Sequence, residues 1–177
     1  MTTPDLRYPV GKFEAPARFT AALRAQCLGD IERTPAALRG AVAGLSPAQL
    51  DTPYRPGGWT VRQVVHHLPD SHMNAYVRVK LALTEDEPTI KPYEQARWAE
   101  LIDGRTAPPE VSLSLLDSLH ARWTMLLKSL APEQFARKFR HPEVGVVTLD
   151  WLLAMYSWHG RHHVAHITAL RKREGWR

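Results

Sequence analysis

Apolar residues recur at three- and four-residue steps along most of this chain, a pattern typical of helices that bury one side. The first such segment begins at about Ala17. Its apolar side consists of four residues, Phe19, Leu23, Cys27 and Ile31. Thr34 followed by Pro35 has the form of a helix N-cap with proline at the first helical position. The pattern therefore predicts either a second helix or a kinked continuation, which ends at about Ala43.

A second amphipathic segment follows the loop sequence YRPGG at 54–58. Thr60 is a residue type that caps helices, and the helix after it is predicted to run to about Leu83. Its buried side is predicted to contain Val61, Val64, Leu68, Ala75 and Val79. Because Pro69 has no amide hydrogen to donate, we expect it to kink this helix near Val65–His66.

Two more helices are predicted in the second half of the chain. One covers about Val111–Ser129, and the other begins near Asp150, an N-cap residue type, and ends at about Arg173. Between them, the stretch FRHPEVGVVTL is β-like and predicts a small hairpin that turns at Glu143–Gly145. Residues 84–110 form a long, proline-containing segment that we interpret as a lid or a crossover loop.

These elements predict an all-α four-helix bundle with a long crossover loop and a small β-hairpin, in a single domain over residues 1–177. No apolar run approaches the ~18 residues that span a bilayer, and the N-terminus lacks the apolar core of a secretion signal. The lone cysteine, Cys27, fits a reducing cytoplasm and is expected to pack in the core. We therefore expect a cytoplasmic protein with no membrane partner.

The net charge of +5 is concentrated at one end of the chain. The last seven residues, RKREGWR, contain four basic residues and one acid, so the rest of the chain is nearly balanced. Because a nucleic-acid-binding protein is expected to present a broad basic face, this distribution argues against a nucleic-acid partner.

Four histidines, His159, His162, His163 and His166, lie close together in the last predicted helix. At about 100° per residue, His163 lies about 40° and His166 about 20° from His159 around the helix axis. They share that side with apolar residues such as Leu170. Imidazoles directed at a core need a partner, and a bound metal ion is the obvious one.

Two pairs in this cluster have the four-residue spacing that lets one helix hold an ion with two side chains. His159 and His163 form the central pair, and His162 and His166 form a second pair nearer the edge of the apolar side. The spacing is that of the H-E-x-x-H motif of zinc proteases, but the glutamate is absent, so that protease class does not follow.

The helix over residues 60–83 is predicted to supply a third ligand. It carries three histidines, His66, His67 and His72. His67 borders the apolar side and shares a polar strip with Ser71, Asn74 and Arg78, whereas His66 lies almost opposite. His67, His159 and His163 would leave one position of a tetrahedral ion open, as in catalytic zinc sites. The alternative is that these are ordinary core histidines, each hydrogen-bonded to a neighbour.

The predicted HPEVG turn adds two candidates for catalysis, His141 and Glu143. If the turn folds over the metal, either could pass protons; otherwise both are polar turn residues in water. His120, on the third helix, has no companion and is interpreted as structural or exposed. The KPYE stretch of the long segment could shape a substrate entrance together with Trp98.

Several strings in this chain resemble the YfiT branch of the DinB superfamily, and together they cover nearly its whole length. They are RYPVGKFE at 7–14, LDTPYRPGGWTVRQVVHHL at 50–68, KLALTEDEPTIKPY at 80–93, LHARWTMLL at 119–127, HPEVG at 141–145 and YSWHGRHHVAHI at 156–167. The resemblance implies a four-helix bundle that is generally a cytoplasmic homodimer. It also implies one divalent metal ion per chain, zinc first and nickel second, held by histidines that match His67, His159 and His163.

The resemblance implies a metal-dependent hydrolase, in which an activated water at the open metal position attacks a small-molecule substrate. Related members are thiol S-transferases that use a low-molecular-weight thiol such as bacillithiol, so metal-assisted thiol transfer is the runner-up. A non-catalytic metal-binding stress protein is a third alternative. All three need the same open coordination position, so the sequence leaves them open, together with any assisting role of Glu143, His141, His66 or His166.

Overall fold

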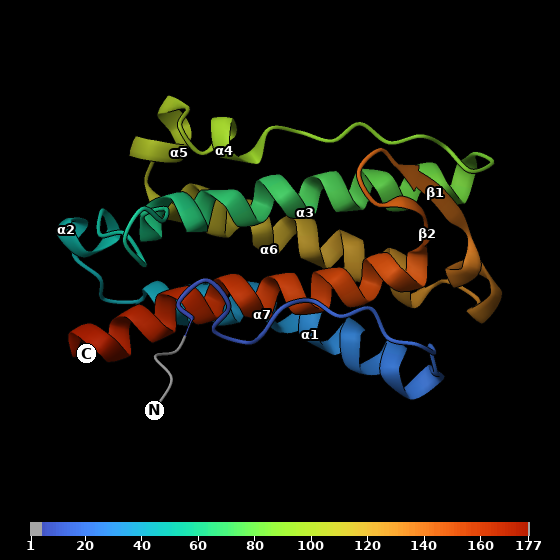
Figure 1. The fold of residues 1–177 in the computed structure, drawn as a ribbon, viewed down its shortest axis with the longest axis horizontal. Helices are drawn as coiled ribbons and strands as arrows, with labels where there is room; N and C mark the ends of the chain where they lie inside the picture. The colour runs from blue at the N-terminus through green and yellow to red at the C-terminus, as the bar shows by residue number, and fades with distance from the viewer. Residues whose placement is uncertain (1–4, 177) are drawn as a thin grey trace.

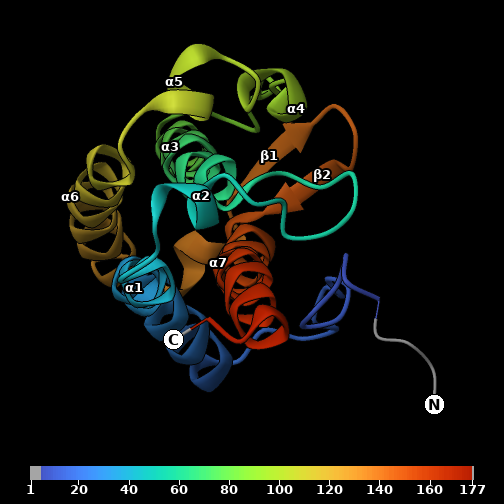
Figure 2. The same ribbon diagram turned by 90° about the vertical axis from the view of Figure 1, so that its left-hand side faces the viewer.

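Four long helices form a bundle in the computed structural model, which describes residues 5–176 (Figure 1). They are α1 (Ala21–Val42), α3 (Val61–Thr84), α6 (Pro109–Lys128) and α7 (Leu149–Glu174). Helices α1 and α7 run in one direction and α3 and α6 in the other, and an end-on view shows the order α1, α6, α3, α7 around the bundle (Figure 2). The predicted all-α four-helix bundle is confirmed.

Short elements connect the long helices. They are α2 (Pro47–Leu50), α4 (Gln95–Trp98), α5 (Ile102–Thr106), a 3-10 turn η1 (Pro132–Ala136), and the strands β1 (Lys138–His141) and β2 (Gly145–Thr148). Residues 85–108 return along the outside of the bundle, because α3 and α6 are parallel and need such a crossover (Figure 1). The crossover interpretation of this segment is therefore confirmed.

The predicted hairpin is also confirmed: β1 and β2 pair antiparallel, with His141 opposite Gly145. The crossover segment joins its outer edge, where the Ile90 amide donates to the Arg140 carbonyl at 3.0 Å. This link ties the crossover to the hairpin at the end of the bundle where α3 ends and α7 begins (Figure 1).

Helix starts follow the capping rules, with two corrections to the predictions. Thr60 caps α3 as predicted, because its hydroxyl accepts from the Gln63 amide at 3.1 Å. Thr148, not Asp150, caps α7, and the Asp150 carboxylate instead pairs with Arg24 at 2.7 Å. Helix α1 begins after its cap Thr20, later than the predicted start at Ala17.

Both helix-internal prolines lie in continuous helices. Helix α1 runs through Pro35 to Val42, so of the two predicted alternatives the continuation is found and the separate second helix is not. Thr34 is no N-cap, and its hydroxyl donates back to the Asp30 carbonyl at 2.9 Å. Helix α3 likewise continues through Pro69. Because a proline donates no amide hydrogen, Pro35 leaves the Ile31 carbonyl without its usual helical partner.

The apolar core is divided into two clusters along the bundle axis. One contains Trp123 and Phe139 toward the hairpin end, and the other contains Leu68 and Ile167 toward the opposite end. Cys27 is buried in the first cluster, which confirms that it packs in the core, and burial raises the pKa of its thiol. In residues 5–176, no helix combines the length and the apolar character needed to cross a membrane.

Candidate metal centre

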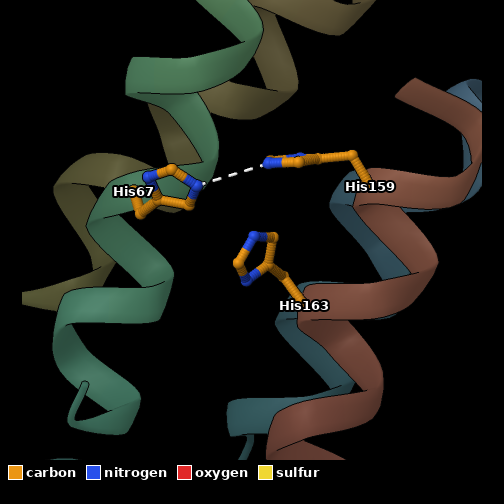
Figure 3. A group of neighbouring side chains, drawn as sticks. All are labelled: His67, His159 and His163. Carbon is orange, nitrogen blue, oxygen red and sulfur yellow. Dashed lines mark hydrogen bonds between the residues drawn. The ribbon is translucent and has the colours of Figure 1, made fainter. Parts of the chain in front are cut away.

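Three histidines from two helices converge where α3 and α7 pack together (Figure 3). His67 comes from α3, and His159 and His163 come from successive turns of α7. Each offers one ring nitrogen, and these three atoms all lie within 4.8 Å of one another. The Nε2 atoms of His67 and His159 are 3.3 Å apart. The structure therefore brings together the three residues that the sequence selects.

Aromatic packing encloses this group on one side. Trp59, the residue before the α3 cap, lies against His67 with 4.7 Å between ring centroids. Its ring is also nearly parallel to that of His163, at 6.4 Å. Trp59, which directly follows the YRPGG loop, therefore forms one wall of the site.

Burial keeps all three imidazoles neutral at physiological pH. It lowers the pKa of His67 to about 3, with a smaller contribution from the nearby His162. It also lowers the pKa values of His159 and His163 well below the ordinary value, and each of them is further lowered by neighbouring histidines. The neutral imidazole is the form that binds a metal ion.

A chain of hydrogen bonds extends from His159 across the bundle. His159 Nδ1 lies 3.1 Å from His72 Nε2, and His72 Nδ1 lies 2.7 Å from His120 Nε2. His120 Nδ1 lies 2.7 Å from the Ile31 carbonyl oxygen, which is the acceptor that Pro35 leaves free in α1. We call His72 and His120 the histidine relay.

The carbonyl at the end of the relay determines every proton position in it. A carbonyl only accepts, so His120 Nδ1 carries the proton, and burial lowers the pKa of His120 to about 4, which leaves its Nε2 as an acceptor. His72 is fully buried and its pKa is lowered well below the ordinary value, so it donates from Nδ1 and accepts at Nε2. His159 must then donate from Nδ1, which leaves a lone pair on its Nε2.

This geometry fits a small divalent cation. The lone pair of His159 faces His67 Nε2 at 3.3 Å, and for metal–nitrogen bonds of 2.0–2.1 Å the edge of a tetrahedron is about 3.3–3.4 Å. His163 directs one nitrogen between the other two rings (Figure 3), while its buried Nδ1 has no hydrogen-bond partner among the described residues. Three neutral nitrogens are also the ligand set of catalytic zinc.

Two cavities meet at this site, and His159 and Gln95 line both of them. The hairpin cavity, of about 440 Å³, lies between α3, the crossover segment, the hairpin and α7. Its lining includes Ser71, Arg78, Tyr93, His141, Glu143 and Tyr156. The loop cavity, of about 410 Å³, lies on the other side, and its lining includes Tyr54, Arg55, Trp59, His162, His163 and His166.

Sequence comparison places the chain in a family. Residues 30–167 match the sequence profile of the DinB superfamily. The chain belongs to that superfamily. A DinB relative from Bacillus subtilis, named "Putative metal-dependent hydrolase YfiT", is 50% identical over 177 residues, which are 99% of each chain. A relative from Bacillus cereus, named "Putative metal-dependent hydrolase", is 55% identical over 172 residues, which are 97% of this chain and 99% of that one.

Solved structures agree with this placement in the DinB superfamily. YfiT from Bacillus subtilis, described as "a probable metal-dependent hydrolase with an unusual four-helix bundle topology", matches with a TM-score of 0.95 and 50% identity, over 97% of this chain and 99% of that one. TT2238, described as "a four-helix bundle protein", matches with a TM-score of 0.59 and 23% identity, over 82% and 98% of the two chains. The second likeness shows the fold alone.

The remaining histidines of this DinB bundle have other partners. His66 Nδ1 lies 2.7 Å from the Ser112 hydroxyl and its Nε2 lies 3.0 Å from the Ala107 carbonyl, away from the three-histidine group. His162 and His166 contact each other, with 3.0 Å between their Nε2 atoms. His120, interpreted as structural or exposed, is buried and belongs to the relay.

Other residues of the site depend on contacts between distant segments. The HPEVG turn reaches the site: His141 and Glu143 line the hairpin cavity together with His159. The KPYE stretch supplies Tyr93 and Glu94 to the same cavity, and the Tyr93 ring packs on Trp98 at 4.6 Å. The relay and the role of Tyr93 are missed by sequence reasoning, because nothing in the periodicity of the crossover segment or of α6 indicates which residues they face.

Proposed function

We propose that this protein is a metal-dependent hydrolase of small molecules, with His67, His159 and His163 as the metal ligands and the hairpin cavity as the substrate site. The observation that carries the proposal is the convergence of three neutral imidazoles beside that cavity. We propose zinc as the ion and nickel as the alternative, because imidazole suits both. Such an ion, when bound, acts as a Lewis acid and lowers the pKa of a water ligand.

Hydroxyl groups cover the cavity wall next to His159. Ser71 Oγ lies 3.5 Å from His159 Nε2 and 3.3 Å from the Tyr156 hydroxyl, which donates to the Ser71 carbonyl at 3.2 Å. Burial raises the pKa of Tyr156 and raises that of Tyr93 to about 12. Both phenols therefore stay protonated. The Tyr156 proton is used by the Ser71 carbonyl, whereas the Tyr93 hydroxyl makes no hydrogen bond to the described residues and can donate to a substrate oxygen, as groups that stabilise developing negative charge do.

A second candidate, metal-assisted thiol transfer, has one observation in its favour. The carboxylates that line the hairpin cavity, Glu94 and Glu143, are both exposed, and Asp70, whose pKa burial raises to about 6, lines neither cavity. Hydrolysis benefits from a general base that accepts a proton from water. A thiol held as thiolate by a metal ion needs less help of this kind.

The test is a comparison of two assays on zinc-loaded and nickel-loaded protein. One follows hydrolysis of an ester and amide panel, and the other follows consumption of a low-molecular-weight thiol with a generic electrophile. We expect hydrolysis that depends on metal, is lost in His163→Ala and persists in His66→Ala. Thiol consumption without hydrolysis would favour the second candidate, and silence in both assays would favour a non-catalytic metal-binding protein.

A further inference from the structure

We propose that the hairpin cavity binds a small molecule with an apolar body and a terminal carboxylate, and that Arg78 and His141 hold this carboxylate at the end of the cavity away from the three histidines. This inference rests on the proposed function, because it names the substrate class of the same site. Three observations support it: the hydrogen-bond donors Arg78 and His141, the apolar cavity wall between them and the three histidines, and the spacing of His67 and Arg78 along α3.

Arg78 is a half-buried cation with no ion-pair partner among the described residues. It lines the hairpin cavity, yet among residues 5–176 no carboxylate lies within ion-pair distance of it. Two other half-buried arginines pair with carboxylates, Arg24 with Asp150 and Arg62 with Asp51, both at 2.7 Å. The half-buried Arg55 and Arg171 instead donate to backbone carbonyls at 2.9 Å. A guanidinium presents a planar fork of donors that matches a carboxylate, so the unpaired Arg78 favours an anionic ligand.

His141 adds a second donor to the same end of the cavity. The backbone amide of Glu143 donates to His141 Nδ1 at 3.2 Å, so this nitrogen is an acceptor and the proton of the neutral ring lies on Nε2. Burial, followed by the nearby charge of Arg78, lowers the pKa of His141, which keeps the ring neutral. The hairpin turn thus offers an N–H group close to the guanidinium.

The charge on the rim limits the ligand to a monoanion. Glu94 and Glu143 also line the cavity, and both are exposed to solvent. Two carboxylates near the opening oppose a dianion more than a single charge, because like charges at short range disfavour one another. A carboxylate therefore fits this end better than a phosphate monoester does.

The wall between the two ends is apolar. Phe139, Trp151, Leu152 and Met155 line the cavity between the hairpin and α7. Opposite them, the buried hydroxyl of Tyr93 makes no hydrogen bond to the described residues. A ligand with an apolar body and one carbonyl group would pack against this wall and accept a hydrogen bond from the Tyr93 hydroxyl, since a buried hydroxyl needs an acceptor.

The spacing along α3 sets the length of the ligand. Arg78 follows His67 by three turns on nearly the same side of the helix, about 16 Å along the axis. Both side chains lean toward the N-terminus of α3, and that of Arg78 is the longer, so the guanidinium and the His67 ring stay on the order of 10–15 Å apart. We infer a substrate whose carboxylate is separated from the reactive carbonyl by a spacer of that length.

The test measures binding of matched probes by titration calorimetry, separately from any turnover. The probes are 4-phenylbutanoate and 4-phenylbutan-1-ol, which differ in the carboxylate. We expect the wild-type protein to bind the acid about tenfold more tightly than the alcohol, as for a hydrogen bond to a charged group. Arg78→Met should abolish this preference, whereas Lys80→Met, which removes an exposed cation from the same helix outside the cavity, should keep it.

The same titrations in His163→Ala distinguish the two proposals. If the preference for the acid persists there and disappears only with Arg78, the carboxylate site is supported even if no ester is hydrolysed, and the proposed function alone fails. If the preference disappears in His163→Ala and survives in Arg78→Met, the acid binds at the metal centre and the inference is overturned. Equal binding of acid and alcohol by the wild-type protein would overturn it too.

Discussion

Two pairs of histidines interleave on α7, and they have the same spacing but different surroundings. His159 and His163 face α3, where His67 meets them. His162 and His166 face the N-terminal arm and the YRPGG loop instead, where the His162 ring lies 6.1 Å from that of Tyr8 and His166 stacks on Tyr54 at 3.9 Å. The comparison shows that spacing alone does not make a metal centre, because a third ligand must come from another element.

The two pairs also differ in what holds their outer nitrogens. The relay accepts the Nδ1 proton of His159, which directs its lone pair toward His67. In the second pair the two Nε2 atoms lie 3.0 Å apart and contact each other, and both buried Nδ1 atoms lack a partner among residues 5–176. Outer hydrogen bonds orient ligating histidines and raise their basicity. Of these four histidines, only His159 has support of this kind among the described residues, because the buried Nδ1 of His163 also lacks a partner there.

The largest expected effect comes from removing one member of the first pair. His163→Ala should lower the affinity for zinc about a thousandfold and reduce bound metal from about one ion per chain to nearly none, because it deletes one of three ligands. Metal analysis and competition with a chromophoric chelator measure this change. His162→Ala, one residue earlier on the same helix, is the matched control and should change affinity less than about threefold. Equal losses in the two variants would mean that both pairs bind metal.

A smaller effect should follow from cutting the relay. His120→Leu leaves all three ligands in place but removes the acceptor for the His72 proton. We expect zinc affinity to fall about 10- to 100-fold, the usual range for lost outer hydrogen bonds to a ligand. Nitrogen-15 NMR of the metal-free protein should show the His159 proton on Nδ1 in the wild type and a mixture of tautomers in the variant. An unchanged tautomer in a folded variant would contradict the proton order deduced for the relay.

A weaker effect is expected at the far end of the relay. Pro35→Ala restores an amide hydrogen that competes with His120 for the Ile31 carbonyl, so zinc affinity should fall only a few-fold, since a carbonyl has two lone pairs. Pro69→Ala is the matched control, because Pro69 also lies inside a helix but outside the relay. Removing a helix-internal proline favours helix formation in both. A loss of affinity as large in Pro69→Ala would trace the effect to helix geometry.

These contrasts explain how far sequence reasoning reaches in this chain. The helix faces and the three ligands can be predicted, because the 3.6-residue period and the four-residue spacing are local properties. The relay cannot, because it depends on packing that brings together His72, His120 and Ile31 from three helices. The start of α7 is ambiguous in the sequence for a different reason, because Thr148 and Asp150 are both good N-cap residues. The structure decides for Thr148, whose hydroxyl accepts a hydrogen bond from the Trp151 amide.

Mild acid should have the smallest effect on zinc affinity. It should also leave both histidine pairs of α7 neutral. Burial lowers the pKa of His67 to about 3, and it lowers those of His162 and His166 to about 4 and 3. Because the ligands stay neutral in the folded protein, protons compete weakly with metal, and zinc affinity should change less than about twofold between pH 7.5 and 6.0. Three ligands with the ordinary pKa of about 6.5 would lose about fiftyfold over that interval.

Protein stability, unlike zinc affinity, should depend on pH in this range. Histidines of the unfolded chain titrate near pH 6.5, so below that pH the unfolded state binds more protons and the free energy of unfolding of the metal-free protein falls as pH falls toward 4. Zinc titrations must therefore be paired with circular dichroism at each pH, to show that the protein measured is folded. A fiftyfold loss of affinity in protein that remains folded at pH 6.0 would mean that His67, His159 and His163 titrate as exposed imidazoles, which contradicts the lowered pKa values that desolvation gives them.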